Sequence, residues 1–444
     1  MLVSLNFSNF RSFAGEARLS FVANSSDHSM RSSLHPIAVG GRDVALLPSI
    51  AIYGANAAGK SNVLLALEYI RDAVRASHSS WLPNSGTHIP QVVSTNQDAS
   101  KFEIEVYIDG NRFQYGFEAT RRFFQNEWLI GFTGARSHTL FRRQSDEEGR
   151  VNLKVGPKFE GGQKSAQILE GRLRPNSLFL SLAAQENFPD ALKILNWLDQ
   201  DVNIPPIRFQ ADPLHASITS GLASKFPEFK SRLMEIMKSA DSTISDIEIT
   251  SSESSASVAE LASSLPEGLR EYFEESNKYK VVFILKGADG DIRIPFVAQS
   301  KGVQKVYSMA GYIISSITHG ELMVIDELEA SMHPHIARTI VDLFQSSATN
   351  KNGAQLLFVT HDTNLLDQSL IRRDQVWFVE KDGCKSHLYS LLEFSPRKDE
   401  DLERGYLRGR YGAVPVPAPT SGWLDDLALE LDIDDEEEAP TESL

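Results

Sequence analysis

The segment Ser49-Ile50-Ala51-Ile52-Tyr53-Gly54-Ala55-Asn56-Ala57-Ala58-Gly59-Lys60-Ser61 decides the fold class of this chain. Residues 49–53 form a short apolar run, which predicts a buried strand. Residues 54–61 match the pattern G-x-x-x-x-G-K-[ST] without a mismatch. A helical repeat of apolar residues follows at Leu64, Leu65, Leu67, Ile70 and Val74. Strand, glycine-rich loop and helix in this order form the context that the motif needs, so the sequence predicts a nucleotide site in an α/β fold.

Each part of this loop has a predicted role. The backbone N–H groups of such a loop, with the helix N-terminus behind them, cradle the α- and β-phosphates. Lys60 is expected to reach the β- and γ-phosphates, and the Ser61 hydroxyl to ligate magnesium. The alternative, a glycine-rich turn that happens to contain a lysine, does not account for the flanking strand and helix. The predicted nucleotide-binding residues of the loop are Gly54, Asn56, Ala57, Ala58, Gly59, Lys60, Ser61 and Asn62.

Two later apolar runs end in residues that suit phosphate chemistry. Residues 322–325 are followed by Asp326 and Glu327, and residues 356–360 are followed by His361. An aspartate at the end of such a strand holds the magnesium shell, and an adjacent carboxylate polarises the attacking water. The imidazole of His361 would reach the γ-phosphate. The alternatives are a carboxylate pair that caps the next helix and an ordinary loop histidine.

The remaining pattern predicts the organisation of the chain. Alternating runs at residues 3–7 and 17–21 predict strands, and Asp109-Gly110 predicts a hairpin. Apolar runs without polar alternation, as at 322–325 and 356–360, are typical of the covered centre of a parallel sheet. Residues 159–278 have a mainly helical pattern and are interpreted as an insert. The predicted division is 1–158 and 279–395 for the two parts of one domain, 159–278 for the insert, 396–424 for an extension and 425–444 for a tail.

Composition excludes several classes of protein. The chain has 444 residues, of which 41% are hydrophobic and 23% charged, so it can bury a large core. No apolar run approaches the roughly 18 residues of a spanning helix, and no secretory signal is visible. We therefore expect a cytoplasmic protein that does not contact a membrane. The single cysteine, Cys384, excludes an internal disulfide framework and a multi-cysteine metal site.

Charge is concentrated at one end of the chain. The formal net charge is -15, and residues 425–444 contain ten acidic residues and no Lys or Arg. The rest of the chain is only mildly acidic, so its global charge does not predict a nucleic-acid binder. The tail is interpreted as a disordered, solubilising segment. Trp423 and Leu424, just ahead of it, keep partner docking open as an alternative.

Together these segments resemble an ABC-type ATPase head of the SMC, RecF and OLD group. The resemblance is carried by residues 9–13 (Asn-Phe-Arg-Ser-Phe), the loop 54–61, the run 322–327 and residues 359–362 (Val-Thr-His-Asp). It implies a P-loop ABC-type ATPase head with a mixed central sheet, an N-terminal antiparallel β subdomain and an inserted helical lobe. It also implies ATP and Mg²⁺ as cofactors and ATP hydrolysis as the reaction. Glu327 and His361 would then be catalytic, and Ser61 and Asp326 would hold the metal.

The resemblance also implies a partner head. Residues 300–304 stand where the family carries its signature, and they keep Ser300, Gly302 and Gln304 of the usual pattern. In the family this segment of one subunit caps the γ-phosphate bound to another, which implies a homo-oligomer with ATP sandwiched between heads. An ordinary Ser-Gly helix start is the alternative.

Three further segments have weaker assignments. The Q-loop of the family has two candidates, Gln91 and Gln97. Residues 330–334 resemble the D-loop. The pair His333 and His335 within and beside that segment is interpreted as structural, since two histidines alone seldom make a metal site.

Residues 405–415, together with residues 360–363, most resemble stand-alone ATPases of the AbiLi, RloA and PARIS AriA type, which are prokaryotic antiphage systems. That resemblance implies a separate effector protein, a nuclease or a toxin, and a phage trigger. Residues 159–278 lack sustained heptads and a cysteine hook, so a coiled-coil repair ATPase is not expected. Only 83 residues of the 444-residue sequence follow His361, so a Toprim nuclease domain is not expected.

A second function class stays open at this point. In a RecF-like repair ATPase that clamps DNA, Arg404, Arg408 and Arg410 would contact phosphates, and the interleaved Tyr406 and Tyr411 would stack on bases. The alternative for this cluster is a structural segment that closes the head. A transporter ATP-binding subunit fits poorly, because its compact plan has no place for the N-terminal strands and the insert.

Overall fold

The computed structural model describes residues 1–39, 42–90, 99–205, 213–251, 274–288 and 290–415. Gln91 and Gln97, the two predicted Q-loop candidates, lie outside these residues, as does the acidic tail with Trp423 and Leu424. Within the described residues, no helix is both long and apolar enough to span a bilayer.

The central sheet is mixed and has six strands in the order β11-β15-β16-β5-β17-β18. Neighbours from β11 to β17 pair in parallel, and β18 is antiparallel to β17. The strands are β5 (Ser49–Tyr53), β11 (Val202–Asn203), β15 (Leu322–Ile325), β16 (Gln355–Val359), β17 (Val376–Asp382) and β18 (Lys385–Ser390). The register places Ile325 opposite Phe358 and Val359 opposite Ile52, so β15, β16 and β5 end at the same edge.

The central strands separate two hydrophobic cores. In β5, Ile50 and Ile52 belong to one core and Ala51 and Tyr53 to the other. This division follows from the strand itself, because successive side chains point to opposite faces. β15 and β16 divide in the same way. A strand that must be apolar on both faces reads as a continuous apolar run, which explains why the pattern at these strands predicted a covered parallel sheet.

The first core joins the central sheet to an antiparallel sheet through helix α1 (Lys60–Ala76). The antiparallel sheet has the order β10-β9-β8-β7-β6-β1-β2. Aromatic rings fill the contact with α1: Tyr69 packs against Phe10, Phe102 and Phe117. The strands are β1 (Leu2–Phe10), β2 (Phe13–Ser20), β6 (Ser100–Ile108), β7 (Asn111–Ala119), β8 (Phe124–Thr133), β9 (Arg136–Ser145) and β10 (Val151–Val155).

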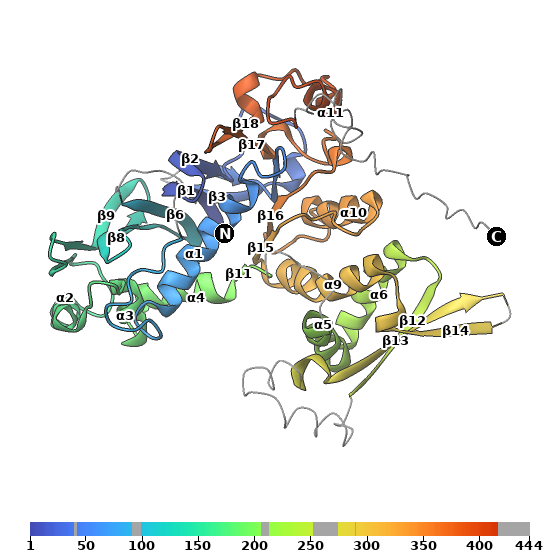
Figure 1. Ribbon diagram of the computed structural model, residues 1–444, viewed down its shortest axis with the longest axis horizontal. Helices are drawn as coiled ribbons and strands as arrows, with labels where there is room; N and C mark the ends of the chain where they lie inside the picture. Colours follow the sequence, from blue (N-terminus) through green and yellow to red (C-terminus); the bar gives the residue numbers. More distant parts are fainter. Residues whose placement is uncertain (40–41, 91–98, 206–212, 252–273, 289, 416–444) are drawn as a thin grey trace, which may run out of the picture.

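The second core lies under helices α9 (Lys301–His319) and α10 (Pro334–Gln345), on the opposite face of the central sheet from α1 (Figure 1). Helices α5 (Pro213–Lys225) and α6 (Pro227–Ala240) pack against α9. Beside them, β12 (Ile244–Ser251), β13 (Tyr279–Gly287) and β14 (Gly290–Pro295) form a three-stranded antiparallel sheet.

The predicted insert, residues 159–278, is divided between the two cores. Helices α2 (Gln163–Ile168), α3 (Phe179–Gln185) and α4 (Pro189–Gln200) contribute to the first core, whereas α5 and α6 contribute to the second. The short strand β11 lies between the two groups and joins the central sheet beside β15. The described part of this range contains helices and also the strands β11 and β12 (Ile244–Ser251), so it is not purely helical, and its two groups of helices pack on opposite faces of the central sheet.

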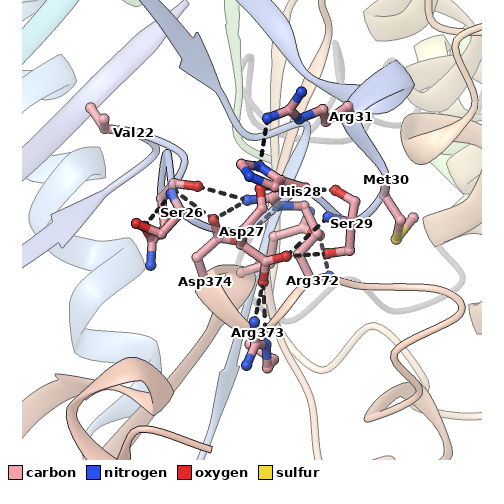
Figure 2. A network of polar contacts seen from close by, with 12 residues as sticks. Val22, Ser26, Asp27, His28, Ser29, Met30, Arg31, Arg372, Arg373 and Asp374 are labelled. Carbon is pink, nitrogen blue, oxygen red and sulfur yellow. Dashed lines mark hydrogen bonds and ion pairs between the residues drawn. The ribbon is translucent and has the colours of Figure 1, made fainter. Parts of the chain in front are cut away.

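An ion-pair network ties the N-terminal segment to the start of β17 (Figure 2). The fully buried Arg372 donates to Asp374 from Nε and Nη2, and to the backbone carbonyl of Asp27. Arg373 pairs with the Asp27 carboxylate at 2.8 Å. Arg373 and Asp374 belong to the helical turn η5 (Arg373–Gln375), and the hairpin of β3 (His35–Val39) and β4 (Arg42–Leu46) follows the N-terminal segment in the chain. In the same turn, Gln375 donates to the Ser49 carbonyl at 3.0 Å, which ties the start of β17 to β5.

The C-terminal end of the described chain covers β17. Helix α11 (Leu402–Leu407) presents Tyr406, which stacks on Phe378 of β17, and Tyr411 stacks on the same ring.

The structure confirms the predicted architecture. It is an α/β head with a mixed central sheet, an N-terminal antiparallel β part and a helical insertion.

Candidate nucleotide-binding site

The loop of residues 54–61 connects β5 to α1 through a backbone that needs glycine at two points. Gly54 has a φ of 152° and Gly59 a φ of 108°. A Cβ at Gly54 would run into the Val379 carbonyl on β17, and a Cβ at Gly59 would lie 2.5 Å from the Ser386 hydroxyl on β18. The loop is pressed against the neighbouring strands, which fixes its path along the edge where β5 ends.

Lys60 begins α1 and folds back over the loop. Its Nζ donates to the carbonyl oxygens of Gly54 and Ala55, both at 3.0 Å, and the residue is 6% exposed. Burial lowers the pKa of Lys60, and nearby carboxylates, that of Asp326 first, oppose this effect. A cation enclosed by the loop backbone is positioned to meet the β- and γ-phosphates of a nucleotide seated on the loop.

Ser61 and Asp326 meet at the predicted metal position. The Ser61 hydroxyl donates to Asp326 Oδ2 at 2.7 Å. The other carboxylate oxygen, Oδ1, is buried and has no hydrogen-bond partner. Burial raises the pKa of Asp326, while the Ser61 hydrogen bond opposes the rise. A hydroxyl and a carboxylate with one unsatisfied oxygen fit Mg²⁺, which prefers oxygen ligands and is held by few protein groups beside phosphates.

A cavity of about 350 Å³ opens at this edge of the sheet. It brings together the loop, the residues after β15 and the residues after β16, as expected where parallel strands end at one edge. The lining residues are Asn56, Ala57, Gly59, Lys60, Ser61, Asn62, Asp326, Glu327, Val359 and His361. Gly54 and Ala58, also predicted to bind the nucleotide, lie outside this lining; Ala58 is buried and its carbonyl accepts a hydrogen bond from Ser386.

Glu327 and His361 face the same cavity from two strand ends. Glu327 is exposed and its backbone is left-handed, with a φ of 50°. A non-glycine residue in this region is uncommon and persists only where surrounding contacts hold it. Burial lowers the pKa of His361, and the nearby Lys60 lowers it further. The carboxylates of Glu329, Glu327 and Asp326 oppose this lowering of the pKa without reversing it. A lowered pKa favours the neutral imidazole, which can donate a hydrogen bond from one ring nitrogen and accept one at the other.

The predicted signature residues are absent from the lining of this cavity. Ser300 caps α9 by accepting from the Val303 backbone at 3.3 Å. The side-chain amide of Gln304 donates to the carbonyls of Val297 and Gln299. Within one chain, Ser300, Gly302 and Gln304 do not line the pocket that holds Lys60.

The N-terminal segment of residues 9–13 reaches the loop through Ser12. Asn62 donates from Nδ2 to the Ser12 hydroxyl at 2.8 Å, and the Ser12 and Ser386 hydroxyls are hydrogen-bonded to each other at 2.7 Å. Asn62 therefore lines the cavity and also ties the first turn of α1 to the turn between β1 and β2. This contact beside the loop of residues 54–61 gives a physical reason why residues 9–13 are one of the motifs that carry the family resemblance.

Two residues beside the site were not predicted from the sequence. Glu329 accepts from the Thr360 hydroxyl at 2.7 Å and from the His361 backbone at 2.6 Å. Lys305, on α9, donates to backbone carbonyls of residues 327–330. Glu329 lies two residues after Glu327, and this third carboxylate close to the pair is a signal that could have identified it. Lys305 gives a fainter signal, a single lysine among apolar residues of a helix.

The comparison with protein-family models places this geometry in a known family. Residues 49–367 match the family described as "AAA domain, putative AbiEii toxin, Type IV TA system". The chain belongs to this AAA-domain family. The matched range contains the loop 54–61, Asp326, Glu327 and His361, so the AAA domain of this chain is of the ATPase type. The narrower antiphage group is not distinguished by the match.

Two solved structures resemble this AAA-domain chain distantly. One is the crystal structure of the SmcHead bound to the C-winged helix domain of ScpA, with a TM-score of 0.42, 14% identity, and coverage of 88% of this chain and 97% of that chain. The other is the Smc head domain with an extended coiled coil bound to the C-terminal domain of ScpA, derived from Pyrococcus furiosus, with a TM-score of 0.38, 12% identity, and coverage of 92% and 98%. No curated protein matches the chain.

The structure corrects one part of the DNA-clamp hypothesis for this AAA-domain protein. Tyr411 is fully buried and Tyr406 is 6% exposed, and both rings pack on Phe378. Rings that close the hydrophobic core cannot stack on bases. Arg410 pairs with Glu400 at 2.6 Å, which favours the structural alternative for this segment.

Proposed function

We propose that this protein binds ATP with Mg²⁺, hydrolyses it, and works as a pair of heads that controls a separate effector protein. The observation that carries the proposal is the cavity in which Lys60, the bonded pair Ser61 and Asp326, and Glu327 with His361 come together from three strand ends. Ser61 and Asp326 are 265 positions apart in the sequence, and each residue of the group has the chemistry that a nucleoside triphosphate requires.

In the proposed mechanism the loop backbone cradles the phosphates and Lys60 exchanges its two carbonyl partners for phosphate oxygens. Ser61 and Asp326 would hold Mg²⁺, with the unsatisfied Asp326 Oδ1 available to its water shell. Mg²⁺ bound there would neutralise charge on the β- and γ-phosphates. Glu327 orients a water molecule and accepts its proton, and His361 hydrogen-bonds the γ-phosphate.

The position of residues 300–304 supports head-to-head assembly. Ser300 and Lys301 are exposed at the N-terminus of α9, a helix of 19 residues, and this segment does not line its own chain's cavity. Helix N-termini carry partial positive charge and unsatisfied N–H groups that suit phosphate. We propose that this end of α9 caps the γ-phosphate of ATP held by a second copy.

The proposed biological role is that of a sensor or scaffold in antiphage defence in the prokaryotic cytoplasm. A phage trigger would change the state of the paired heads and release or activate a bound nuclease or toxin. The family description, which names a toxin of a type IV toxin–antitoxin system, supports a role in such a two-component system. The sequence resemblance of residues 360–363 and 405–415 supports the antiphage assignment.

The test is affinity purification of a tagged Glu327→Gln protein from its native cells in ATP and Mg²⁺, with and without nuclease treatment. A stoichiometric protein that survives nuclease treatment supports the proposal. A tagged Lys60→Ala protein serves as the control and should lose a partner whose binding depends on ATP. Recovery of DNA without any protein would instead support the RecF-like repair ATPase.

A further inference from the structure

Lys305 on α9 is a buried cation with three backbone partners. The residue is 3% exposed, and its Nζ donates to the carbonyls of Glu327 at 3.1 Å, Leu328 at 3.4 Å and Ala330 at 2.8 Å. An ammonium group has three N–H donors, so this loop can satisfy all of them. Burial lowers the pKa of Lys305 to about 8, with nearby carboxylates opposing.

Burying a charged lysine in α9 costs free energy, and an apolar side chain could fill the same position without that cost. Taking a charged group out of water is unfavourable unless hydrogen bonds replace its hydration. The other buried positions of α9 around Lys305 are occupied by residues such as Val306 and Met309, which pack in the second core. A lysine at this point holds the backbone of the loop that carries Glu327, which an apolar residue of the same length would not do.

The first turn of α9 touches the same loop at a second point. A Cβ at Gly302 would lie 2.8 Å from the Ser331 carbonyl oxygen, so only glycine allows this approach. Ser300 and Gln304, the other two predicted signature residues, belong to the same turn. The segment proposed to meet a second copy's nucleotide is therefore in direct contact with the loop 327–331.

The opposite side of the loop is attached to the residues after β16. The Glu329 carboxylate accepts from the Thr360 hydroxyl and the His361 backbone. Lys305 and Glu329 thus hold the loop from two sides, and the loop carries Glu327 in its left-handed backbone. A movement of the α9 N-terminus would be passed to Glu327 and, through Glu329, to His361.

We propose that Lys305 is a positioning residue that couples the signature segment of one head to Glu327 in the same head's own ATP site. This inference rests on the proposed function. When a second copy's nucleotide engages residues 300–304, the helix moves as a unit, and the three Lys305 hydrogen bonds shift the carbonyls that set the Glu327 backbone. Each head then hydrolyses its own ATP at a rate that depends on occupancy of the other site.

The test compares wild type with Lys305→Met, which keeps the length of the side chain and removes its donors, and with Lys305→Arg, which restores donors. We expect Lys305→Met to keep the Kd for ATP and to lower kcat by roughly 2- to 30-fold. The Hill coefficient of hydrolysis should fall below its wild-type value, which is expected to lie between 1 and 2, the limit for two sites. Lys305→Arg should recover part of both.

Several outcomes would overturn the coupling. One is that Lys305→Met has the same kcat and Hill coefficient as the wild type. Another is that the wild type itself hydrolyses ATP without cooperativity. A loss confined to ATP affinity would show that the lysine only supports the binding loop. If the wild type does not hydrolyse ATP, the proposed function fails as well, and this result is distinct from an active wild type that Lys305→Met leaves unaltered.

Hydrogen–deuterium exchange gives a readout that does not depend on turnover, with Glu329→Gln as a second variant should Lys305→Met fold poorly. In the wild type, ATP and Mg²⁺ should slow exchange of residues 327–331 more when the heads pair than when dilution separates them. In Lys305→Met that difference should vanish while the protection of residues 54–61 by ATP persists. In Glu329→Gln, which leaves the Lys305 hydrogen bonds in place, the difference should remain at residues 327–331 and vanish at residues 360–361. Equal protection of residues 327–331 in Lys305→Met and wild type would contradict the proposal, and so would a loss of the difference at 327–331 in Glu329→Gln.

Discussion

At the scale of single residues, the site depends on groups held by backbone atoms. Lys60 rests on two loop carbonyls, and Asp326 keeps one buried oxygen without a partner. Lys60 Nζ has three N–H donors and two carbonyl acceptors, so its hydrogen bonding is incomplete. The buried Asp326 Oδ1 has no hydrogen-bond partner, which carries a desolvation cost. Under the proposed function, phosphate oxygens and the water shell of a metal ion would complete both arrangements.

Replacing Lys60 with alanine removes the cation that is proposed to meet the β- and γ-phosphates. We expect Lys60→Ala to abolish detectable ATP binding and every ATP-dependent change in assembly, measured by isothermal titration calorimetry and light scattering. Lys351→Ala, which removes an exposed lysine far from the cavity, is the matched control. ATP affinity equal to that of wild type in Lys60→Ala would show that the loop does not hold the phosphates.

Replacing Glu327 with glutamine keeps the shape of the side chain and removes its basicity. Glu327→Gln should bind ATP as the wild type does and hydrolyse it roughly 10²- to 10⁴-fold more slowly, the usual effect of losing a general base. Steady-state phosphate release and a separate ATP-binding assay check the two halves of this expectation. Glu235→Gln, an exposed glutamate on α6, is the control. Turnover near the wild-type rate would assign the base to another residue.

At the scale of elements, the strands that are buried on both faces of the central sheet could be predicted from the sequence. The runs at β5, β15 and β16 are apolar throughout, and their following residues Asp326 and His361 could be assigned to one edge because parallel strands end together. The positions of Ser12 and Glu329 could not be predicted in this way. Their contacts, with Asn62 and with Thr360, depend on turns whose paths no periodicity describes.

Helix α5 shows why the second core was harder to predict. Its buried face is built from small polar residues: Thr219 donates to the Ser308 carbonyl and accepts from the Gly311 backbone, and Ser220 bonds to the Tyr307 hydroxyl. In the sequence, a helix of this kind has no apolar stripe. Strand β12 was hidden for a similar reason, because it lies within a range rich in serine.

The network of Figure 2 gives a prediction at this scale. Burial disfavours the Asp27 carboxylate, but hydrogen bonds from Ser29 and the ion pair with Arg373 outweigh burial and hold its pKa well below the ordinary value of 3.8. Its contribution to stability is therefore full above that value and is lost as the pH falls below it. Asp27→Asn should lower the free energy of unfolding at pH 7 by roughly 1.5 to 3 kcal/mol.

The pH dependence checks the electrostatic origin of that loss. In urea unfolding followed from pH 7 to pH 3, the difference between wild type and Asp27→Asn should stay constant down to about pH 5 and narrow below the ordinary carboxyl pKa. A difference that does not change over the whole range would assign the effect to packing.

At the scale of the whole molecule, the proposal requires two chains for each complete ATP site. Ser300→Asp keeps a good N-cap residue for α9 and adds a negative charge where the second copy's γ-phosphate would lie. We expect it to prevent ATP-dependent doubling of mass in a Glu327→Gln background while ATP binding persists. Ser300→Asn, a neutral residue of the same shape that also caps helices, should pair normally. A dimer that forms equally well with Ser300→Asp would rule out this face.

The order of strands across the central sheet also has a consequence for synthesis of the protein. β5 lies between β16 and β17, and both of these neighbours come roughly 300 residues later in the chain. A nascent chain that has been synthesised only as far as α1 contains residues 54–61 but neither Asp326 nor His361. The strands β16 and β17, which flank β5, are also still missing. We expect a nascent chain to retain nucleotide only once translation has delivered the second half, so ATP binding would distinguish finished heads from partial ones.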